Sequence, residues 1–389
     1  MSKPANSMLL ASLGRRLLRF RLDAAGVLHY HDDLALPSPL HYAWPHPSQR
    51  LMVVGCSARW FTPNDTDHML VVVEVPEHGE MRLRGQPVRL SSRPIHVTLD
   101  EAGTHVLALF NDPPGVQVHA LTAEGLVGAE IPQRADLDVG TFAHQVRVFP
   151  GGRWVLVAAR GNDARAGRAE DPGSLRRFAF RQGRLDPVQV VAPNGGFGFG
   201  PRHVDFHPAL PCIYVALERQ NELHVYRHRD GVIEDQPAQV VSTLAPGKRP
   251  AFKQYAGAVH VHPLGTQVYV TNRDDPHAGA EASHLTGDNT LVMFDLDPVS
   301  GALGPPRHVE TGAFHVRTFT LQPPWLIAAS QADAVIQDAQ GTRQVPASLG
   351  VFHIEPDGGL RFAHRAEVPS GGSMLFWCGF PTAYGSRWQ

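Results

Sequence analysis

The sequence predicts an all-β protein, a seven-bladed β-propeller, from a repeat, a strand pattern and two complementary chain ends. Six apolar runs of the β type each end on a residue that the run does not need, at intervals of 55, 49, 58, 55 and 58 residues. These residues are Cys56, Asn111, Arg160, Glu218, Arg273 and Gln331. A long period carried by short strands and turns is typical of four-stranded blades that close radially into a ring.

The elements of one repeat follow in a fixed order. An alternating strand comes first and often ends at a proline turn, as in HQVRVFPGG and HVDFHPALP. The apolar run is the second strand, and a third follows at 221–229, 289–297 and 349–357. A glycine-containing turn then leads to a polar fourth strand. Alternation and turn chemistry together indicate an antiparallel meander in each unit.

Six complete units leave the seventh blade to the two ends of the chain. We expect the C-terminal strand 374–380 to pair with N-terminal strands near 7–13, 15–22 and 26–34. This pairing closes the ring and leaves no free sheet edge. One propeller domain is therefore expected over residues 1–389.

Composition excludes several partners. The net charge of −2 and the pI near 6.9 give no reason to expect nucleic acid or an anionic membrane. No apolar run approaches the length needed to span a bilayer, and MLLASLG is short for a signal sequence. Three distant cysteines argue against a disulfide framework. We expect a cytoplasmic protein, a monomer or weak homo-oligomer.

The loop lengths predict which face of the ring is functional. In a meander, the connections from second to third strand and from fourth to first strand emerge on the same side. The long segments all belong to these two kinds: 56–69, 160–174, 193–201, 245–257, 273–288 and 331–348. Long loops on one side of a rigid scaffold are where binding and catalysis usually lie. Arg160, Glu218 and Arg273 are therefore expected to converge at this mouth.

Two first strands carry polar residues to the same mouth. His144 and Arg202 each stand six positions before the proline that ends the strand, Pro150 and Pro208. Because an antiparallel neighbour places the start of a first strand beside the end of a second strand, His144 should lie near Arg160, and Arg202 near Glu218.

Three further residues are expected to bind substrate. They are His203, next to Arg202, and Lys248 and Arg249 on the long loop that follows. Arginines bind carboxylate or phosphate bidentately, and a carboxylate or an imidazole can move a proton. The mouth is therefore predicted to bind a small anionic substrate, with the arginines stabilising a developing oxyanion.

Plainer interpretations stand beside this one. Arginine and glutamate at strand ends also form structural ion pairs across a propeller channel. His260 and His262 share one strand face, but no further ligand stands at a supporting spacing, so neither a metal nor another cofactor is expected. Cys56 is expected to be a buried, inert thiol.

With these residues placed, the chain resembles the seven-bladed propeller lactonase family, which includes bacterial propeller-type 6-phosphogluconolactonases and the fungal carboxy-cis,cis-muconate cyclase. The resemblance is most specific at FAHQVRVFPGGR, GPRHVDFHP, IYVALERQNELHVY and VHVHPLGTQVYVTNR. It implies catalytic or substrate-binding roles for His144, Arg202, Glu218 and Arg273. Arg160 stands where the family usually has an acid, which adds positive charge to the mouth.

The resemblance and the basic mouth imply a metal-independent lactonase acting on an anionic sugar lactone such as 6-phosphogluconolactone, with Glu218 or His144 activating water. One alternative is a carboxymuconate-type cycloisomerase, in which the same arginines clamp carboxylates. The other alternative is a non-catalytic propeller that binds a ligand or a protein, because fold alone does not assign function.

Overall fold

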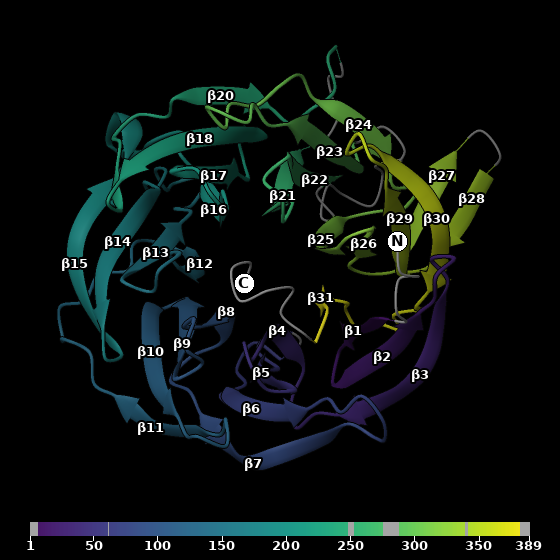
Figure 1. Cartoon of the computed structure of the whole chain (residues 1–389), viewed down its shortest axis with the longest axis horizontal. Coiled ribbons are helices and arrows are strands. Elements are labelled where there is room, and N and C mark those ends of the chain that lie inside the picture. Colours follow the sequence, from purple (N-terminus) through teal and green to yellow (C-terminus); the bar gives the residue numbers. More distant parts are fainter. Residues whose placement is uncertain (1–6, 61, 248–252, 275–287, 339–340, 382–389) are drawn as a thin grey trace.

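The computed structural model is a ring of seven antiparallel sheets around a central axis (Figure 1). It describes residues 7–60, 62–247, 253–274, 288–338 and 341–381. Within these ranges the only helical element is the 3-10 turn η1, Pro193–Gly196. The expected fold class, an all-β seven-bladed propeller, is confirmed.

Blades 1 to 3 are regular meanders. Blade 1 contains β4 (Leu40–Pro45), β5 (Leu51–Cys56), β6 (Met69–Glu74) and β7 (Arg82–Arg89). Blade 2 contains β8 (Pro94–Leu99), β9 (His105–Asn111), β10 (Pro114–Leu121) and β11 (Val127–Ile131). Blade 3 contains β12 (Ala143–Val148), β13 (Trp154–Ala159), β14 (Ser174–Arg181) and β15 (Arg184–Val191).

Blades 4 and 5 follow the same order with shorter outer strands. Blade 4 contains β16 (Pro201–Phe206), β17 (Cys212–Leu217), β18 (Glu222–Arg229), β19 (Val232–Ile233) and β20 (Gln239–Ser242). Blade 5 contains β21 (Gln254–Val261), β22 (Gln267–Asp274), β23 (Thr290–Asp295) and β24 (Arg307–Glu310). In blade 4 the expected single polar strand is divided, since β19 and β20 both pair with β18.

Blades 6 and 7 complete the ring. Blade 6 contains β25 (Val316–Gln322), β26 (Trp325–Ser330), β29 (Ser348–Ile354) and β30 (Leu360–Glu367), with the inserted hairpin of β27 (Ala334–Asp338) and β28 (Gly341–Val345). Blade 7 contains β31 (Cys378–Gly379), β1 (Ser7–Leu13), β2 (Arg16–Leu22) and β3 (Leu28–Ala35).

The two ends of the chain close the ring as predicted. Leu10 pairs with Gly379 and Ala11 with Cys378, which places β31 beside β1. The closing strand is shorter than the expected 374–380, because the backbone N–H groups of Phe376 and Trp377 donate to the Ser12 hydroxyl, at 3.0 Å each, instead of joining a ladder.

The hydrophobic core is a ring of layers between neighbouring blades. One such layer joins Val225 of blade 4 to Val261 and Val270 of blade 5, all 3% exposed or less. Burying one such side chain is worth about 1.5–3 kcal/mol. Because each blade buries its faces against its neighbours, the chain needs no single central core.

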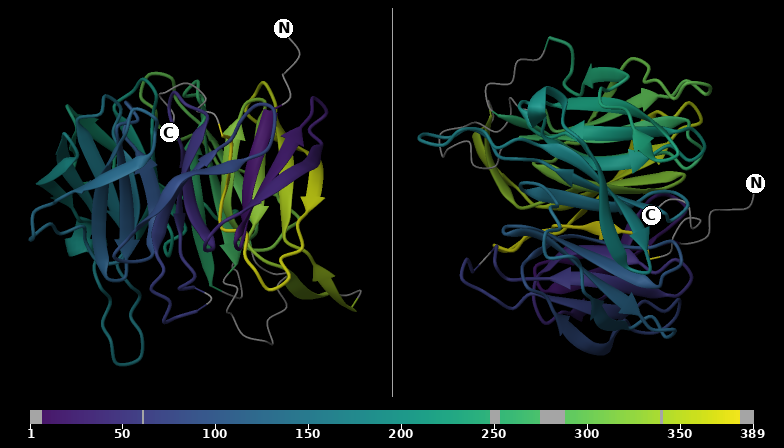
Figure 2. Two further views of the ribbon diagram at one scale, coloured as in Figure 1. Left: turned by 90° about the horizontal axis from the view of Figure 1, so that it is seen from below. Right: turned by 90° about the vertical axis from the view of Figure 1, so that its left-hand side faces the viewer.

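The two faces of the ring differ in their connections. At one face short turns lock neighbouring blades together: His46 Nε2 donates to the Gly103 carbonyl and His207 Nε2 to the Gly265 carbonyl, each at 3.1 Å. The long connections, including the loop between β13 and β14 and the β27–β28 hairpin, project from the other face (Figure 2). We call the end of the axis on that face the mouth.

Candidate active site at the mouth of the propeller

A β-bulge begins the inner strand of each of the six sequential blades. At this point the pairing with the second strand shifts register and leaves one or two residues unpaired. The unpaired residues are His41, Ile95, His144, Arg202, Gly257 with Ala258, and Arg317. Bulges re-aim side chains and occur next to active sites. His144 and Arg202 therefore reach the mouth through the same backbone feature in adjacent blades.

The ends of the second strands bring the other predicted residues to the same place. Glu218 directly follows β17 and meets three arginines from three blades. Its Oε1 contacts Nη2 of Arg273 and lies 2.9 Å from Nε of Arg202, while its Oε2 contacts Nη1 of Arg160. The predicted proximity of Arg202 to Glu218 is confirmed. We call these four residues the Glu218 cluster.

Burial makes the electrostatics of the Glu218 cluster strong. The side chain of Glu218 is 5% exposed, Arg202 2% and Arg273 5%, whereas Arg160 is 20% exposed. Burial alone would raise the pKa of Glu218, but the charges of Arg160, Arg273 and Arg202 outweigh it and hold that pKa well below its usual range. Glu218 is thus ionised, and three cations around one anion leave a net charge of +2.

Several donors of the Glu218 cluster have no acceptor among the described residues. Nη1 of Arg202 and the Nε atoms of Arg160 and Arg273 are buried and unpaired. Nε of Arg202, although 2.9 Å from Glu218, is not aligned for a hydrogen bond. An unpaired buried donor costs about 1–3 kcal/mol, more for a charged group. This arrangement fits the binding of an anion that supplies the missing acceptors.

His144 and His203 lie on the axis side of the Glu218 cluster. Ala143 pairs with Ala159 across β12 and β13, so His144, the next residue of β12, lies beside the end of β13 and near Arg160, as predicted. The rings of His144 and His203 are 5.2 Å apart, and Nδ1 of His144 is buried without a hydrogen-bond partner. Burial first, and then nearby Arg202, lowers the pKa of both imidazoles well below the usual value, so both are neutral.

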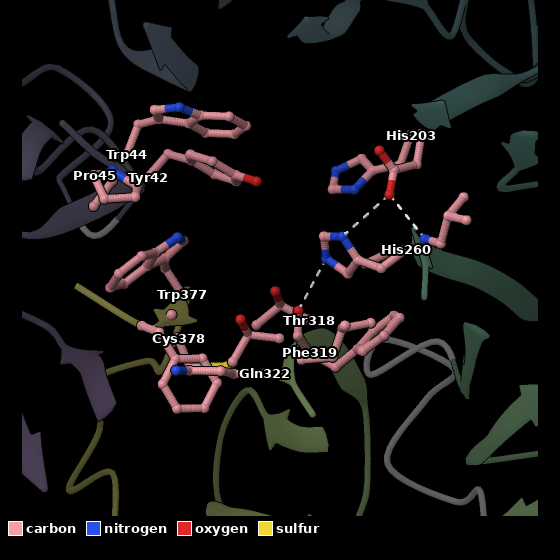
Figure 3. A pocket seen from close by; sticks show the side chains of 18 of the residues that line it. Tyr42, Trp44, Pro45, His203, His260, Thr318, Phe319, Gln322, Trp377 and Cys378 are labelled. Carbon is pink, nitrogen blue, oxygen red and sulfur yellow. Dashed lines mark hydrogen bonds and ion pairs between the residues drawn. The ribbon is translucent and has the colours of Figure 1, made fainter. Parts of the chain in front are cut away.

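Beside His203 the inner strands line a cavity of about 120 Å³. In Figure 3, His203 and His260 line one wall, with Tyr42, Trp44 and Trp377 across from them. This cavity runs along the inner strands, from His203 and Ala258 at the bulges to Pro45 and Pro263 at the far ends. His203 is the predicted site residue shared between the two regions.

The metal pair considered from the sequence has structural partners instead. His260 Nε2 donates to the Phe319 carbonyl at 3.1 Å, and His262 Nδ1 accepts from the backbone N–H of Leu264 at 3.2 Å. Within the described ranges, no group of three or more His, Cys, Asp and Glu side chains is arranged to hold a metal ion. The Cys56 thiol is fully buried, and burial raises its pKa to about 12.

Two predicted substrate-binding residues, Lys248 and Arg249, lie outside the described residues. Arg219 was not predicted as a site residue, yet it secures the start of the neighbouring loop: its Nη2 donates to the Arg160 carbonyl at 3.0 Å and its Nη1 pairs with Asp163 at 2.9 Å. Arg219 directly follows Glu218, so its adjacency to a strand end was the available signal.

His41 and Arg317 were also missed, although the sequence carries their signal. Each stands six positions before a proline, Pro47 and Pro323, as His144 and Arg202 do. The same spacing therefore finds the bulged residue in blades 1, 3, 4 and 6.

The fold and the mouth define a class: seven-bladed propellers with a buried cluster of arginines and one glutamate at one end of the axis. Residues 34–339 match the family model described as lactonase, 7-bladed β-propeller. The chain belongs to this family, and the predicted class, an enzyme of the lactonase family, is confirmed.

Curated relatives and solved structures agree with the family. The chain is 23% identical over 263 residues to the 6-phosphogluconolactonase of Yersinia pestis, covering 65% of this chain and 69% of the relative. It is 24% identical over 255 residues to the Pectobacterium atrosepticum 6-phosphogluconolactonase, covering 65% and 70%. The periplasmic gluconolactonase of Pseudomonas aeruginosa has the same fold, with a TM-score of 0.73 at 20% identity, over 94% of this chain and 97% of that one.

Among the residues described, no helix combines the length and the apolar character that crossing a membrane requires.

Proposed function

We propose that this protein hydrolyses the lactone of an anionic sugar, with 6-phosphogluconolactone as the leading substrate. The observation that carries the proposal is the buried Glu218 cluster, whose net charge of +2 and unpaired arginine donors suit an anion. The names of the relatives support a sugar lactone as the substrate class.

In the proposed reaction, His144 takes the proton of the attacking water. As the water oxygen bonds to the lactone carbonyl carbon, the carbonyl electron pair moves onto its oxygen, and Arg202 and Arg273 stabilise that oxyanion. The bond between the carbonyl carbon and the ring oxygen then breaks, and His144 returns the proton to the ring oxygen. The product is the open-chain acid, and the arginines supply the positive charge without a metal ion.

His144 is assigned as the base because the carboxylate of Glu218 is already paired with arginines. Both carboxylate oxygens of Glu218 contact arginines, and these charges disfavour its protonation. Nδ1 of His144 has no hydrogen-bond partner, and the low pKa of the imidazole keeps it neutral. The same low pKa makes the imidazolium, once formed, a good proton donor to the departing ring oxygen. Glu218 in this scheme orients the three guanidinium groups.

The test is hydrolysis of freshly generated 6-phosphogluconolactone, followed by acid release above the spontaneous rate. His144→Ala should abolish most of the activity, and wild-type kcat/KM should stay level as the pH is lowered through 6.5, since the His144 pKa of the free protein lies below that value. Hydrolysis no faster than the spontaneous rate would exclude this substrate. An acid limb at or above pH 6.5 would exclude His144 as the base.

We also propose a cellular location and an oligomeric state. The three cysteines are all free and buried, which suits a reducing cytoplasm, although the Pseudomonas neighbour is periplasmic by name. We propose a cytoplasmic enzyme of carbohydrate metabolism that acts as a monomer or weak homo-oligomer. Cell fractionation and light scattering of the purified protein test these two points.

A further inference from the structure

Arg317 occupies in blade 6 the place that His144 occupies in blade 3. Both are the bulged residue of their inner strand, β25 and β12. In both blades the residue before the strand has a left-handed backbone, with φ of 51° at Phe142 and 50° at His315. This conformation is uncommon for such residues and clusters at functional sites. The side chain of Arg317 is therefore presented to the mouth as that of His144 is.

The backbone hydrogen bonds repeat as well. The Phe142 carbonyl accepts from the N–H of Arg160 at 3.1 Å, and the His315 carbonyl accepts from the N–H of Gln331 at 3.2 Å. The match extends over the whole turn, so the likeness of the two positions does not depend on one dihedral angle.

Arg317 rests on an aromatic surface built across the ring closure. Its guanidinium carbon lies 5.3 Å from the centre of the Phe376 ring, which comes just before β31 of blade 7. The imidazole of His41, the bulged residue of blade 1, stacks on the same ring at 4.9 Å and 24°. His41 Nε2 donates to the Ser57 carbonyl at 3.0 Å. We call Arg317, Phe376 and His41 the Phe376 platform.

The Phe376 platform lies on the other half of the mouth from the Glu218 cluster. The platform draws on blades 6, 7 and 1, and the cluster on blades 3, 4 and 5. Figure 1 accordingly shows β25, β31 and β4 across the axis from β12 and β16. A ligand that spans the mouth would meet one site with each of its ends.

Charge distinguishes Arg317 from the arginines of the cluster. Arg160, Arg202 and Arg273 share the carboxylate of Glu218. Arg317 forms no ion pair and donates no hydrogen bond to any described residue, although it is only partly exposed. Burial, followed by the charge of Arg273, lowers its pKa to about 9. It is protonated at neutral pH, and an anion would offset the cost of that charge.

We propose that Arg317 binds the anionic group of the substrate that is remote from the lactone carbonyl, while Arg202 and Arg273 hold the lactone end. This inference rests on the proposed function. The substrate class is then an aldonolactone with a phosphate or a carboxylate at its far end. A guanidinium binds either group through two parallel hydrogen bonds, and the Phe376 ring holds the guanidinium plane in position.

The kinetic test compares two lactones that differ only in the remote anion, 6-phosphogluconolactone and glucono-1,5-lactone. Arg317→Met keeps the apolar contact with Phe376 and removes the charge. A charged hydrogen bond contributes about 1.5–3 kcal/mol, so kcat/KM for the phosphorylated lactone should fall about 10- to 150-fold, mostly through KM. The unphosphorylated lactone should change less than about twofold. Arg361→Met, at a side chain that is 63% exposed on blade 6, is the matched control and should change neither.

A binding test separates failure of this inference from failure of the proposed function. Calorimetry with the unreactive acids 6-phosphogluconate, glucarate and gluconate needs no turnover. If neither lactone is hydrolysed but 6-phosphogluconate or glucarate binds more tightly than gluconate, and Arg317→Met removes the difference, the subsite stands and the lactonase proposal fails. If the wild type does not discriminate against gluconate, or Arg317→Met discriminates as the wild type does, the subsite is wrong.

Discussion

Replacing Glu218 by Gln should destabilise the protein, because it removes the carboxylate that three guanidinium groups share. At an effective dielectric constant of about 20, a charge pair about 4 Å apart interacts by about 4 kcal/mol. Three such attractions are lost, while the repulsion between the arginines remains. Desolvation and relaxation reduce the gross value, and breaking a buried pair by removing one partner typically costs about 3–5 kcal/mol.

The expected change in melting temperature follows from the size of the chain. The unfolding entropy of about 2.1 cal/mol/K per residue gives about 0.8 kcal/mol/K for 389 residues. A loss of about 3–5 kcal/mol therefore lowers Tm by about 4–6 °C. Glu222→Gln is the control, since its carboxylate is 36% exposed and pairs only with His224 among the described residues; its Tm should change by less than about 1 °C.

Differential scanning calorimetry with and without phosphate measures the effect. Phosphate should raise the Tm of Glu218→Gln more than that of the wild type, because an anion replaces the lost carboxylate. Adding Arg160→Met to Glu218→Gln should recover part of the stability, since it removes one of the repelling charges. If Glu218→Gln melts like the wild type, or the double variant is no more stable than the single one, the electrostatic account of the cluster is wrong.

Three further predictions concern acid stability, ring closure and the loop beside the site. Burial holds the pKa of His144 and His203 in the folded protein well below 6.5, so on acidification the unfolded chain takes up protons first. The free energy of unfolding should therefore decrease as the pH falls below 6.5, by up to about 1.4 kcal/mol per pH unit for each histidine. A Tm that is level from pH 7.5 to 5.5 would contradict this. Trp377→Ala, at a side chain 5% exposed in the closing blade, should cost about 3–5 kcal/mol in urea unfolding, and a cost below 1 kcal/mol would show that closure does not depend on it. Gly173 ends the loop that begins at Arg160, and Gly173→Ala would place a Cβ 1.8 Å from the Phe199 carbonyl oxygen. The loop must shift to relieve this clash, so lactonase activity should fall. Unchanged kcat/KM would show that the loop is not needed.

The repeat made much of the site readable from the sequence. Equivalent positions of successive blades converge on one axis, so residues 58 and 55 positions apart, such as Arg160, Glu218 and Arg273, could be placed together before any coordinates. The proline spacing that identified His144 also marks Arg317, which was overlooked because no acidic or basic partner stood at a matching strand end in its blade.

The sequence by itself determined the blades, their order, the closure of the ring and the face at which the candidate site residues gather. These follow from strand periodicity and turn residues, which are local and are repeated along the chain. Only the tertiary structure decided that Glu218 pairs with all three arginines. It also decided that, among the described residues, Arg202 keeps unpaired donors and Arg317 lies on Phe376 with no carboxylate partner. Such contacts join side chains from different blades, and their energies depend on separations and burial that no local pattern encodes.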